Sequence, residues 1–154
     1  TPLHLSVRGG HKNLMRKLIK HGADPRRTNS SGDTALHLAL RQPLSLWVDA
    51  RQIQLRKIEL LLSTPVGREA VSMRDRAGRP ALHLVSLIAQ TEAALLVLEL
   101  ILKTNPDMSV TDLEGNSPEQ FARLHHMPSI AERLEEFRAS HREKPPLGHG
   151  EIKH

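Results

Sequence analysis

Ten histidines are the residues in this chain that first suggest chemistry. Three of them, His4, His37 and His83, stand at the same place in the pentapeptides TPLHL, TALHL and PALHL. Histidine can act as an acid or base near neutral pH, and it is a common metal ligand. Its recurrence in one motif raises the alternative that it has a structural role, which depends on the elements that carry it.

Other catalytic arrangements are missing from the sequence. The segment RGGHKN lacks the Lys-Ser/Thr ending of a phosphate-binding loop. No G-x-S-x-G nucleophile elbow occurs, and the absence of cysteine excludes thiol catalysis. Glu135 and Glu136 are adjacent on a predicted helix and therefore point to different faces. We expect that this chain by itself is not an enzyme and takes neither a cofactor nor a small-molecule substrate.

A repeated pattern sets the positions of these side chains. TPLHL at residue 1 returns as TALHL at 34 and PALHL at 80, with a weaker SPEQFA at 117. Each copy leads to a second segment rich in Leu and Ile, and then to a glycine-containing tip: NSSGD, RDRAGR or DLEGN. Thr34 and Ser117 are good helix N-caps, and Pro2 and Pro118 suit the first helical position. The pattern predicts pairs of helices, with positive φ at the tip glycines Gly32, Gly78 and Gly115.

These residues resemble the ankyrin repeat, which has a period of 33 residues and the signature T-P-L-H-x-A. The resemblance covers about residues 1–138 and rests on three separate matches at compatible spacing. It implies an all-α fold, an ankyrin-repeat solenoid of stacked helix-turn-helix units with short β-turn or hairpin tips. We expect an ankyrin-repeat domain over 1–138, with repeats at about 1–33, 34–79, 80–116 and 117–138. A flexible C-terminal tail is expected over 139–154, where HREKPPLGHGEIKH is polar and has no periodicity.

The departures from a regular period predict insertions. The second spacing is 46 residues, with about ten extra residues around RQPLSLWVDARQIQ and about three in the turn STPVGREAVSM. The third spacing is 37 residues, with about four extra near LIAQTEA. The final block has HHMPS where a Gly-His turn would stand, which fits a terminal capping repeat.

The resemblance also implies a structural role for the repeated histidine. In ankyrin repeats it hydrogen-bonds the Thr hydroxyl and nearby backbone, so Pro80 in place of Thr should remove one partner of His83. A zinc site needs ligands about 2.0–2.1 Å from one ion, whereas histidines in successive layers would stand about 10 Å apart. We therefore predict no metal site.

Composition limits the classes of partner. Only three residues are aromatic, Trp47, Phe121 and Phe137, so the core must be aliphatic, and few rings are present to stack on bases. Residues 1–80 carry 15 basic and 6 acidic residues, whereas residues 81–154 carry 7 and 11, so the two parts have charges of +9 and −4. Residues 81–102 are apolar but are interrupted by Gln90, Thr91, Glu92 and Glu99, which indicates two buried helices. We expect no nucleic-acid partner and no membrane span.

Partner binding in ankyrin domains takes place at the turn tips and on the concave face of the first helices. The resemblance carries these positions over to Arg8, Arg26, Arg27, Asn29, Ser31, Asp33, Arg41, Arg74, Arg76, Arg79, Leu113 and Glu114, and Trp47 is a separate candidate outside the repeat pattern. Arginine binds carboxylates through two parallel hydrogen bonds, so we expect an acidic segment to dock along the first tips. Trp47 lies in the insertion PLSLWVD, and either covers the lengthened helix 49–63 or serves as an exposed anchor.

The sequence thus predicts a protein–protein interaction module. A different class remains open, a substrate-recruiting ankyrin domain of a larger enzyme, such as a bacterial secreted effector that modifies a host protein. A chain without cysteine suits a reducing compartment. We expect the cytoplasm, with the nucleus, or the host cytosol for an effector, as alternatives.

Overall fold

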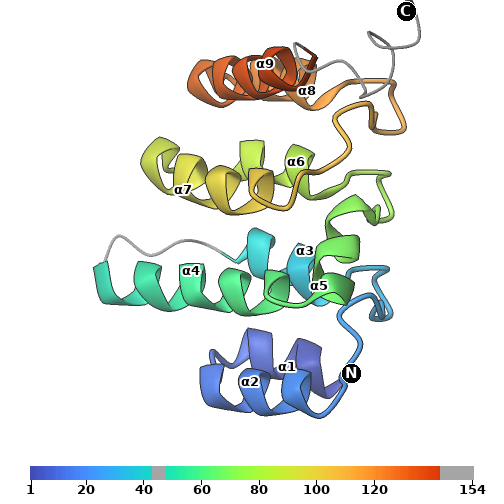
Figure 1. Ribbon diagram of the computed structural model, residues 1–154, viewed down its shortest axis with the longest axis vertical. Helices are drawn as coiled ribbons and strands as arrows, with labels where there is room; N and C mark the ends of the chain where they lie inside the picture. The colour runs from blue at the N-terminus through green and yellow to red at the C-terminus, as the bar shows by residue number, and fades with distance from the viewer. Residues whose placement is uncertain (43–47, 143–154) are drawn as a thin grey trace, which may run out of the picture.

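The computed structural model describes residues 1–42 and 48–142, which form four stacked helix pairs (Figure 1). The pairs are α1 (Pro2–Arg8) with α2 (Lys12–Lys20), α3 (Ala35–Arg41) with α4 (Val48–Leu62), α6 (Ala81–Leu84) with α7 (Thr91–Leu102), and α8 (Pro118–Leu124) with α9 (Pro128–Arg142). A 3₁₀ turn, η2 (Val85–Leu87), continues α6. The described residues contain no strand, so the all-α prediction is confirmed.

The stack has two layers of helices. The first helices α1, α3, α6 and α8 contact one another in order, and the second helices α2, α4, α7 and α9 do the same. One aliphatic core runs through all four pairs, with Leu36, Ile58, Leu98 and Leu134 at 1% exposure or less. Stacking is therefore what buries the apolar faces of these short helices, since helices of this length are not stable alone.

The apolar stretch 81–102 is divided as expected into two buried helices. The division falls at residues 88–90, and Gln90 is the N-cap of α7. Buried side chains of α7 include Val97, Leu98 and Ile101. Within the two described ranges, no helix is both long and apolar enough to span a bilayer.

One predicted turn is instead helical. The segment STPVGREAVSM contains α5 (Pro65–Glu69) and the 3₁₀ turn η1 (Ala70–Ser72). Thr64 caps α5 by accepting a hydrogen bond from the Gly67 amide at 3.0 Å, and Pro65 occupies the first helical position. Ala70 and Val71 are buried, so the inserted residues add a short packed helix between the second and third pairs.

The C-terminal boundary also differs from the prediction. Residues 139–142 belong to helix α9 and not to a flexible tail, because α9 ends at Arg142. The rest of the predicted tail lies outside the described residues. Trp47 also lies outside them.

Candidate protein-binding surface

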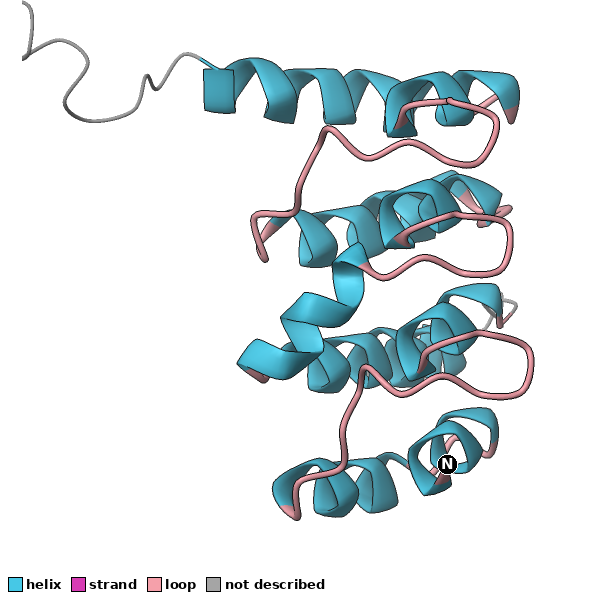
Figure 2. Cartoon of the chain, turned by 90° about the vertical axis from the view of Figure 1, so that its right-hand side faces the viewer, coloured by secondary structure: helices cyan, strands magenta, loops and turns pink. Residues whose placement is uncertain are grey.

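Three turns project from the same side of the stack, one between each pair of layers (Figure 2). We call them tip 1 (Asn29–Asp33), tip 2 (Asp75–Arg79) and tip 3 (Asp112–Asn116), and together the tip ridge. In each tip the amide of the first residue donates to the carbonyl of the fifth, at 2.9, 3.1 and 3.1 Å respectively. The predicted positive φ is present at the tip glycines, at 78° for Gly32, 71° for Gly78 and 83° for Gly115.

The first residue of each tip also fixes the turn through its side chain. The Oδ1 atom of Asn29 accepts hydrogen bonds from the backbone amides of both Ser31 and Asp33, at 2.9 and 3.0 Å. Asp75 and Asp112 make the corresponding pairs of bonds two and four residues further on, at 2.9–3.0 Å. Asn and Asp are typical of such turns because the side-chain oxygen substitutes for a backbone acceptor. Neither aspartate was among the residues predicted from the sequence, although each stands three residues before a tip glycine.

The repeated histidines connect the first helices to the loops that follow them. Nε2 of His4 donates to the Asp33 carbonyl at 2.8 Å, and Nε2 of His83 donates to the Asn116 carbonyl at 2.8 Å. His37 reaches the Met73 carbonyl at 3.0 Å, just before tip 2. A carbonyl only accepts, so Nε2 carries the proton and Nδ1 is the acceptor in each ring. No group of three potential ligands suited to a metal ion occurs in the part of the chain that is described.

Nδ1 of the histidine completes the N-terminal cap of the helix. The amide of Thr34 donates to Nδ1 of His37 at 3.1 Å, and the amide of His37 donates to the Thr34 hydroxyl at 3.3 Å. This reciprocal arrangement is a capping box, with histidine in the place usually taken by Glu or Gln. In the fourth repeat Gln120 occupies that place and pairs with Ser117 in the same way.

The third repeat lacks this cap. Pro80 has neither an amide N–H nor a hydroxyl, and Nδ1 of His83 is buried without a hydrogen-bond partner among the described residues. The predicted loss of a partner is therefore confirmed. Burial lowers the pKa of His83, as it does that of His37, because the charged imidazolium would lose its hydration.

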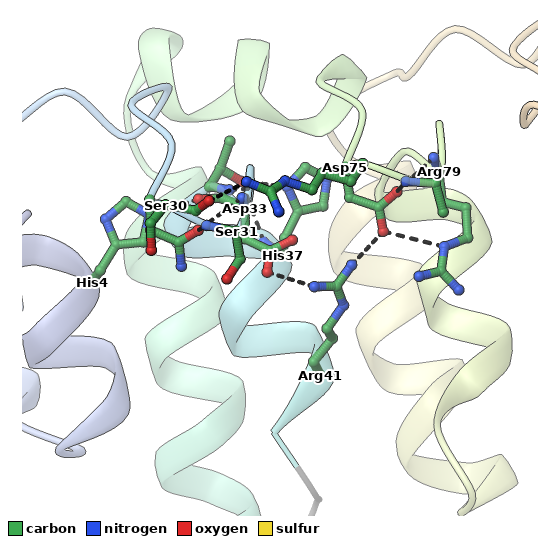
Figure 3. A network of polar contacts seen from close by, with 12 residues as sticks. His4, Ser30, Ser31, Asp33, His37, Arg41, Asp75 and Arg79 are labelled. Carbon is green, nitrogen blue, oxygen red and sulfur yellow. Dashed lines mark hydrogen bonds and ion pairs between the residues drawn. The ribbon is translucent and has the colours of Figure 1, made fainter.

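Tips 1 and 2 are fastened together by an alternating row of charges (Figure 3). Nη1 of Arg41 donates to Asp33 at 2.5 Å, and Nη2 of the same side chain donates to Asp75. Nε of Arg79 lies 3.1 Å from the same oxygen of Asp75, Oδ2, that accepts from Arg41. The side chains of Asp33 and Asp75 are 6% and 0% exposed. The charged groups of three predicted contact residues thus form ion pairs within this chain: Asp33, Arg41 and Arg79.

The charge on Asp75 is retained despite its burial. Burial alone would raise the pKa of this carboxyl group, but hydrogen bonds from the Arg79 and Ala77 amides and the charges of Arg79 and Arg41 hold the pKa below its usual value. The carboxylate is therefore a fixed anion at neutral pH, and it holds both guanidinium groups in place.

Arg74 and Arg76 differ from the other tip arginines. Nη1 of Arg74 donates to the Thr111 carbonyl at 2.7 Å, and Nη2 of Arg76 donates to the Ser30 carbonyl. Both side chains are exposed, and neither forms an ion pair with a carboxylate in the described ranges. Their guanidinium groups are therefore oriented by neighbouring loops while their charge stays uncompensated.

The remaining predicted contact residues are mostly at the surface. Arg26 pairs with Asp24 at 3.1 Å and with Glu69 at 2.9 Å. The pKa of Asp24 is lowered, chiefly by this hydrogen bond. Four others are exposed, namely Arg8, Arg27, Ser31 and Glu114. Leu113 is 74% exposed, the highest value among the large apolar residues of the described part.

A cleft of about 430 Å³ adjoins the Arg41 network on the side of the first helices. It lies between α3 and the α6–η2 segment and is lined mainly by Leu40, Leu84, Leu87 and Ile88. Leu87 is 42% exposed within it. The structure thus brings an apolar cleft close to the charged residues that fasten the first two tips.

Comparison with known proteins identifies the repeat. The family model described as ankyrin repeats (3 copies) matches residues 1–48. The B-cell lymphoma 3 protein homolog of Mus musculus is 32% identical over 119 residues, which is 77% of this chain and 24% of that protein. The palmitoyltransferase AKR1 of Lachancea kluyveri is 30% identical over 118 residues, 77% of this chain and 14% of that protein. The chain thus spans a quarter or less of these relatives, and with its four stacked helix pairs and histidine-capped helices it belongs to the ankyrin-repeat family.

Proposed function

We propose that this chain binds a partner protein through its tip ridge and the adjacent face of its first helices. Ankyrin repeats are in general protein-interaction modules. The observation that carries the proposal is the state of Arg74 and Arg76, which are exposed, oriented by backbone carbonyls and unpaired with any described carboxylate. An oriented guanidinium loses little conformational freedom on binding, so more of its interaction energy contributes to affinity.

The chemistry of the ridge favours an acidic segment of the partner. Arginine forms paired, charge-assisted hydrogen bonds with carboxylates, and it is enriched among the residues that dominate binding energy. Arg27 and Arg8 are exposed as well, and they make no side-chain hydrogen bond or ion pair with other residues of ranges 1–42 and 48–142. Positive charge thus extends from tip 2 toward the first repeat.

Charge reversal tests this proposal. A partner is first isolated with the immobilised chain, and its dissociation constant is then measured for the wild type and for Arg74→Glu/Arg76→Glu. We expect affinity to fall tenfold or more. The matched control is Arg16→Glu/Arg56→Glu, which makes the same change in net charge at exposed positions of α2 and α4. Unchanged affinity in the tip variant contradicts the proposal, and equal losses in both variants would assign binding to net charge alone.

A second candidate function is substrate recruitment for a larger enzyme. It is favoured by the similarity to a protein named as a palmitoyltransferase, of which this chain matches only 14%. A bacterial secreted effector that modifies a host protein would use the domain in the same way. The sequence of the native protein decides between the two, because recruitment requires a catalytic domain on the same polypeptide. The tip variant should then lower modification of the substrate protein while the activity on a small model substrate stays unchanged.

The proposed place of action is the cytoplasm. The nucleus, or the host cytosol for an effector, are the alternatives. Imaging of the tagged native protein checks this assignment.

A further inference from the structure

The tips pack on one another in a regular way that determines which side chains face a partner. A Cβ atom on Gly32 would lie 2.8 Å from Cγ of Arg76, and a Cβ atom on Gly78 would lie 2.6 Å from Cγ of Leu113. The second residue of each later tip therefore lies directly over the glycine of the tip before it. The corresponding residue of tip 1 is Ser30. Along the ridge these positions present a hydroxyl group, a guanidinium group and an apolar side chain in that order.

Arg74, directly before tip 2, and Arg76, within it, pair with no described carboxylate and reach in opposite directions along the ridge. Arg76 bonds to the Ser30 carbonyl in tip 1, whereas Arg74 bonds to the Thr111 carbonyl at the base of tip 3. Packed helices lie 8–10 Å apart, so two layers of the stack separate these loops by roughly 16–20 Å. The guanidinium groups, which lie beside the two carbonyls, are separated by about this distance or slightly less.

This separation sets the spacing of a complementary ligand. An extended chain advances about 3.3 Å per residue, and alternate side chains point to the same face. Two carboxylates that face the ridge together must therefore be an even number of residues apart. A separation of four residues covers about 13 Å and one of six covers about 20 Å, so these two spacings match the arginines once side-chain reach is included.

The third tip changes the character of the surface. Leu113 is 74% exposed, and Glu114 beside it is exposed and acidic. No arginine stands in tip 3. An acidic residue of the ligand would be repelled there, whereas an apolar residue would cover Leu113 against Gly78.

We propose that the tip ridge binds an extended protein segment in which two acidic side chains, four or six residues apart on one face, engage Arg76 and Arg74 and are followed on the Arg74 side by an apolar residue that covers Leu113. This inference rests on the proposed function of the ridge. A protein ligand fits better than a nucleic acid, because a uniformly charged phosphate backbone would also be placed against Glu114. The described ridge offers no aromatic ring for base stacking.

Synthetic peptides test the spacing. Each peptide has a Gly/Ser/Thr background and two glutamates separated by two, four, six or ten residues, with a leucine placed two residues beyond one glutamate. Dissociation constants are measured with the 154-residue chain by fluorescence anisotropy. We expect the four- and six-residue spacings to bind at least fivefold more tightly than the other two. Equal affinity across the four spacings would overturn the proposal, because binding would then depend on charge alone.

Variants of the chain assign the contacts. Arg74→Met and Arg76→Met should each abolish the spacing preference, whereas Arg56→Met should preserve it. Leu113→Ser should weaken binding only for peptides that carry the leucine. Thermal unfolding of each variant checks that the stack is intact. A folded Arg76→Met variant that keeps the wild-type preference for the four- and six-residue spacings contradicts the assignment.

Two further outcomes separate this inference from the proposed function. If no peptide shows a spacing preference but Arg74→Glu/Arg76→Glu still loses the isolated partner, the ligand pattern is wrong and the ridge remains the binding surface. If the charge reversal also has no effect, both proposals fail. A single-stranded oligonucleotide of equal charge that binds more tightly than every peptide would replace the protein ligand with nucleic acid.

Discussion

The residue just before each first helix determines whether Nδ1 of the buried histidine in that helix has a hydrogen-bond partner. Thr34 gives His37 two hydrogen-bonding groups, whereas Pro80 gives none to Nδ1 of the buried His83. A buried polar atom without a partner costs about 1–3 kcal/mol. The third repeat is therefore the least well capped of the histidine-containing repeats.

Replacing Pro80 by Thr should stabilise the protein. The backbone at Pro80 has φ −77° and ψ 174°, close to the −76° and 169° of Thr34, so threonine fits without strain. A side-chain cap contributes about 1 kcal/mol, and the new donors satisfy His83, while the loss of proline rigidity costs about 0.4–1 kcal/mol. We expect a net gain of about 1 kcal/mol, which corresponds to a rise in Tm of about 2–4 °C in thermal denaturation.

The reverse change provides the control. Thr34→Val keeps the side-chain shape but removes the hydroxyl group, so it should lower the free energy of unfolding by about 1 kcal/mol. A Pro80→Thr variant that melts below the wild type would show that His83 does not need the missing donor.

The same histidines should make the protein less stable in mild acid. Burial holds the pKa of His37 and His83 below the 6.5 of an exposed histidine, so the unfolded chain takes up protons first as the pH falls. The two histidines hardly affect stability above pH 7, and the free energy of unfolding should fall between pH 6.5 and 5.5 by at most about 1 kcal/mol per histidine. Urea denaturation at these pH values measures it.

Glutamine offers a matched control for this pH dependence, because Gln120 already fills the histidine position of the fourth repeat. His37→Gln should flatten the decline between pH 6.5 and 5.5. A variant with the wild-type slope would mean that other groups cause the loss.

At the level of elements, helix α8 differs from the first helices before it. Leu3, Leu36 and Leu82 are buried at one repeat position, whereas Glu119 occupies that position in α8 and is only 5% exposed. Its carboxylate lies 2.7 Å from Nε of Arg138 in α9. Arg138 also donates to the Met108 carbonyl at 2.5 Å, so this pair ties the last helix to the preceding loop.

Removing one partner of this ion pair should lower the free energy of unfolding more than replacing both partners with apolar residues. Glu119→Leu alone leaves Arg138 without its carboxylate and should lower the free energy of unfolding by about 2–3 kcal/mol. Glu119→Leu/Arg138→Met restores an apolar contact of the kind seen in the earlier repeats and should lie within about 1 kcal/mol of the wild type. Urea denaturation of the wild type, both single variants and the double variant gives the coupling energy. Additive effects would show that the pair is not coupled.

The sequence predicted the helices well where the repeat pattern was regular. The TPLHL, TALHL and PALHL copies located the first helices, and the tip glycines located the turns with their positive φ. Helix α5 was missed because comparison with the first repeat treats extra residues as turn, although Thr64 and Pro65 are helix-start signals. The extension of α9 to Arg142 was missed because HREK has no apolar residue to mark a helical face.

At the level of the whole molecule, Arg41 joins two layers of the stack. It binds Asp33 of tip 1 and Asp75 of tip 2, whose side chains are almost fully buried. Arg41→Met should therefore lower the free energy of unfolding by about 2 kcal/mol and speed hydrogen exchange at the Ala77 and Arg79 amides. The comparison is Arg56→Met, where an exposed pair with Glu59 should cost less than about 0.5 kcal/mol.

A denaturant series with exchange measurements tests this role. Arg41→Met/Asp33→Asn should recover part of the stability, since the amide leaves no uncompensated charge. Wild-type stability in Arg41→Met would show that the two tips are held by other contacts.

The sequence could not separate arginines that hold the tips from arginines available to a partner. Arg41, Arg74, Arg76 and Arg79 have the same chemistry, and their difference arises from which loop lies within reach after stacking. Asp33 is the converse case, because a polar tip residue proves to be buried. The contacts of Arg41, Arg74 and Arg76 with Asp75, Thr111 and Ser30 join residues 34, 37 and 46 positions apart, and a repeat pattern does not encode them.

Gly32 and Gly78 each pack under the following tip, which gives the array a direction. Leu113 packs over Gly78 of tip 2, so changing Leu113 changes the side chain that lies on tip 2. Ser30 of tip 1 packs over no glycine of an earlier described tip. Because a glycine has no side chain, the residue that packs over it does not have to fit a particular neighbouring side chain. This position therefore accepts residues as different as arginine over Gly32 and leucine over Gly78. This position can therefore exchange one binding chemistry for another while the histidines, caps and turns beneath it stay the same. New specificity can arise on this scaffold one residue per layer, without a new fold.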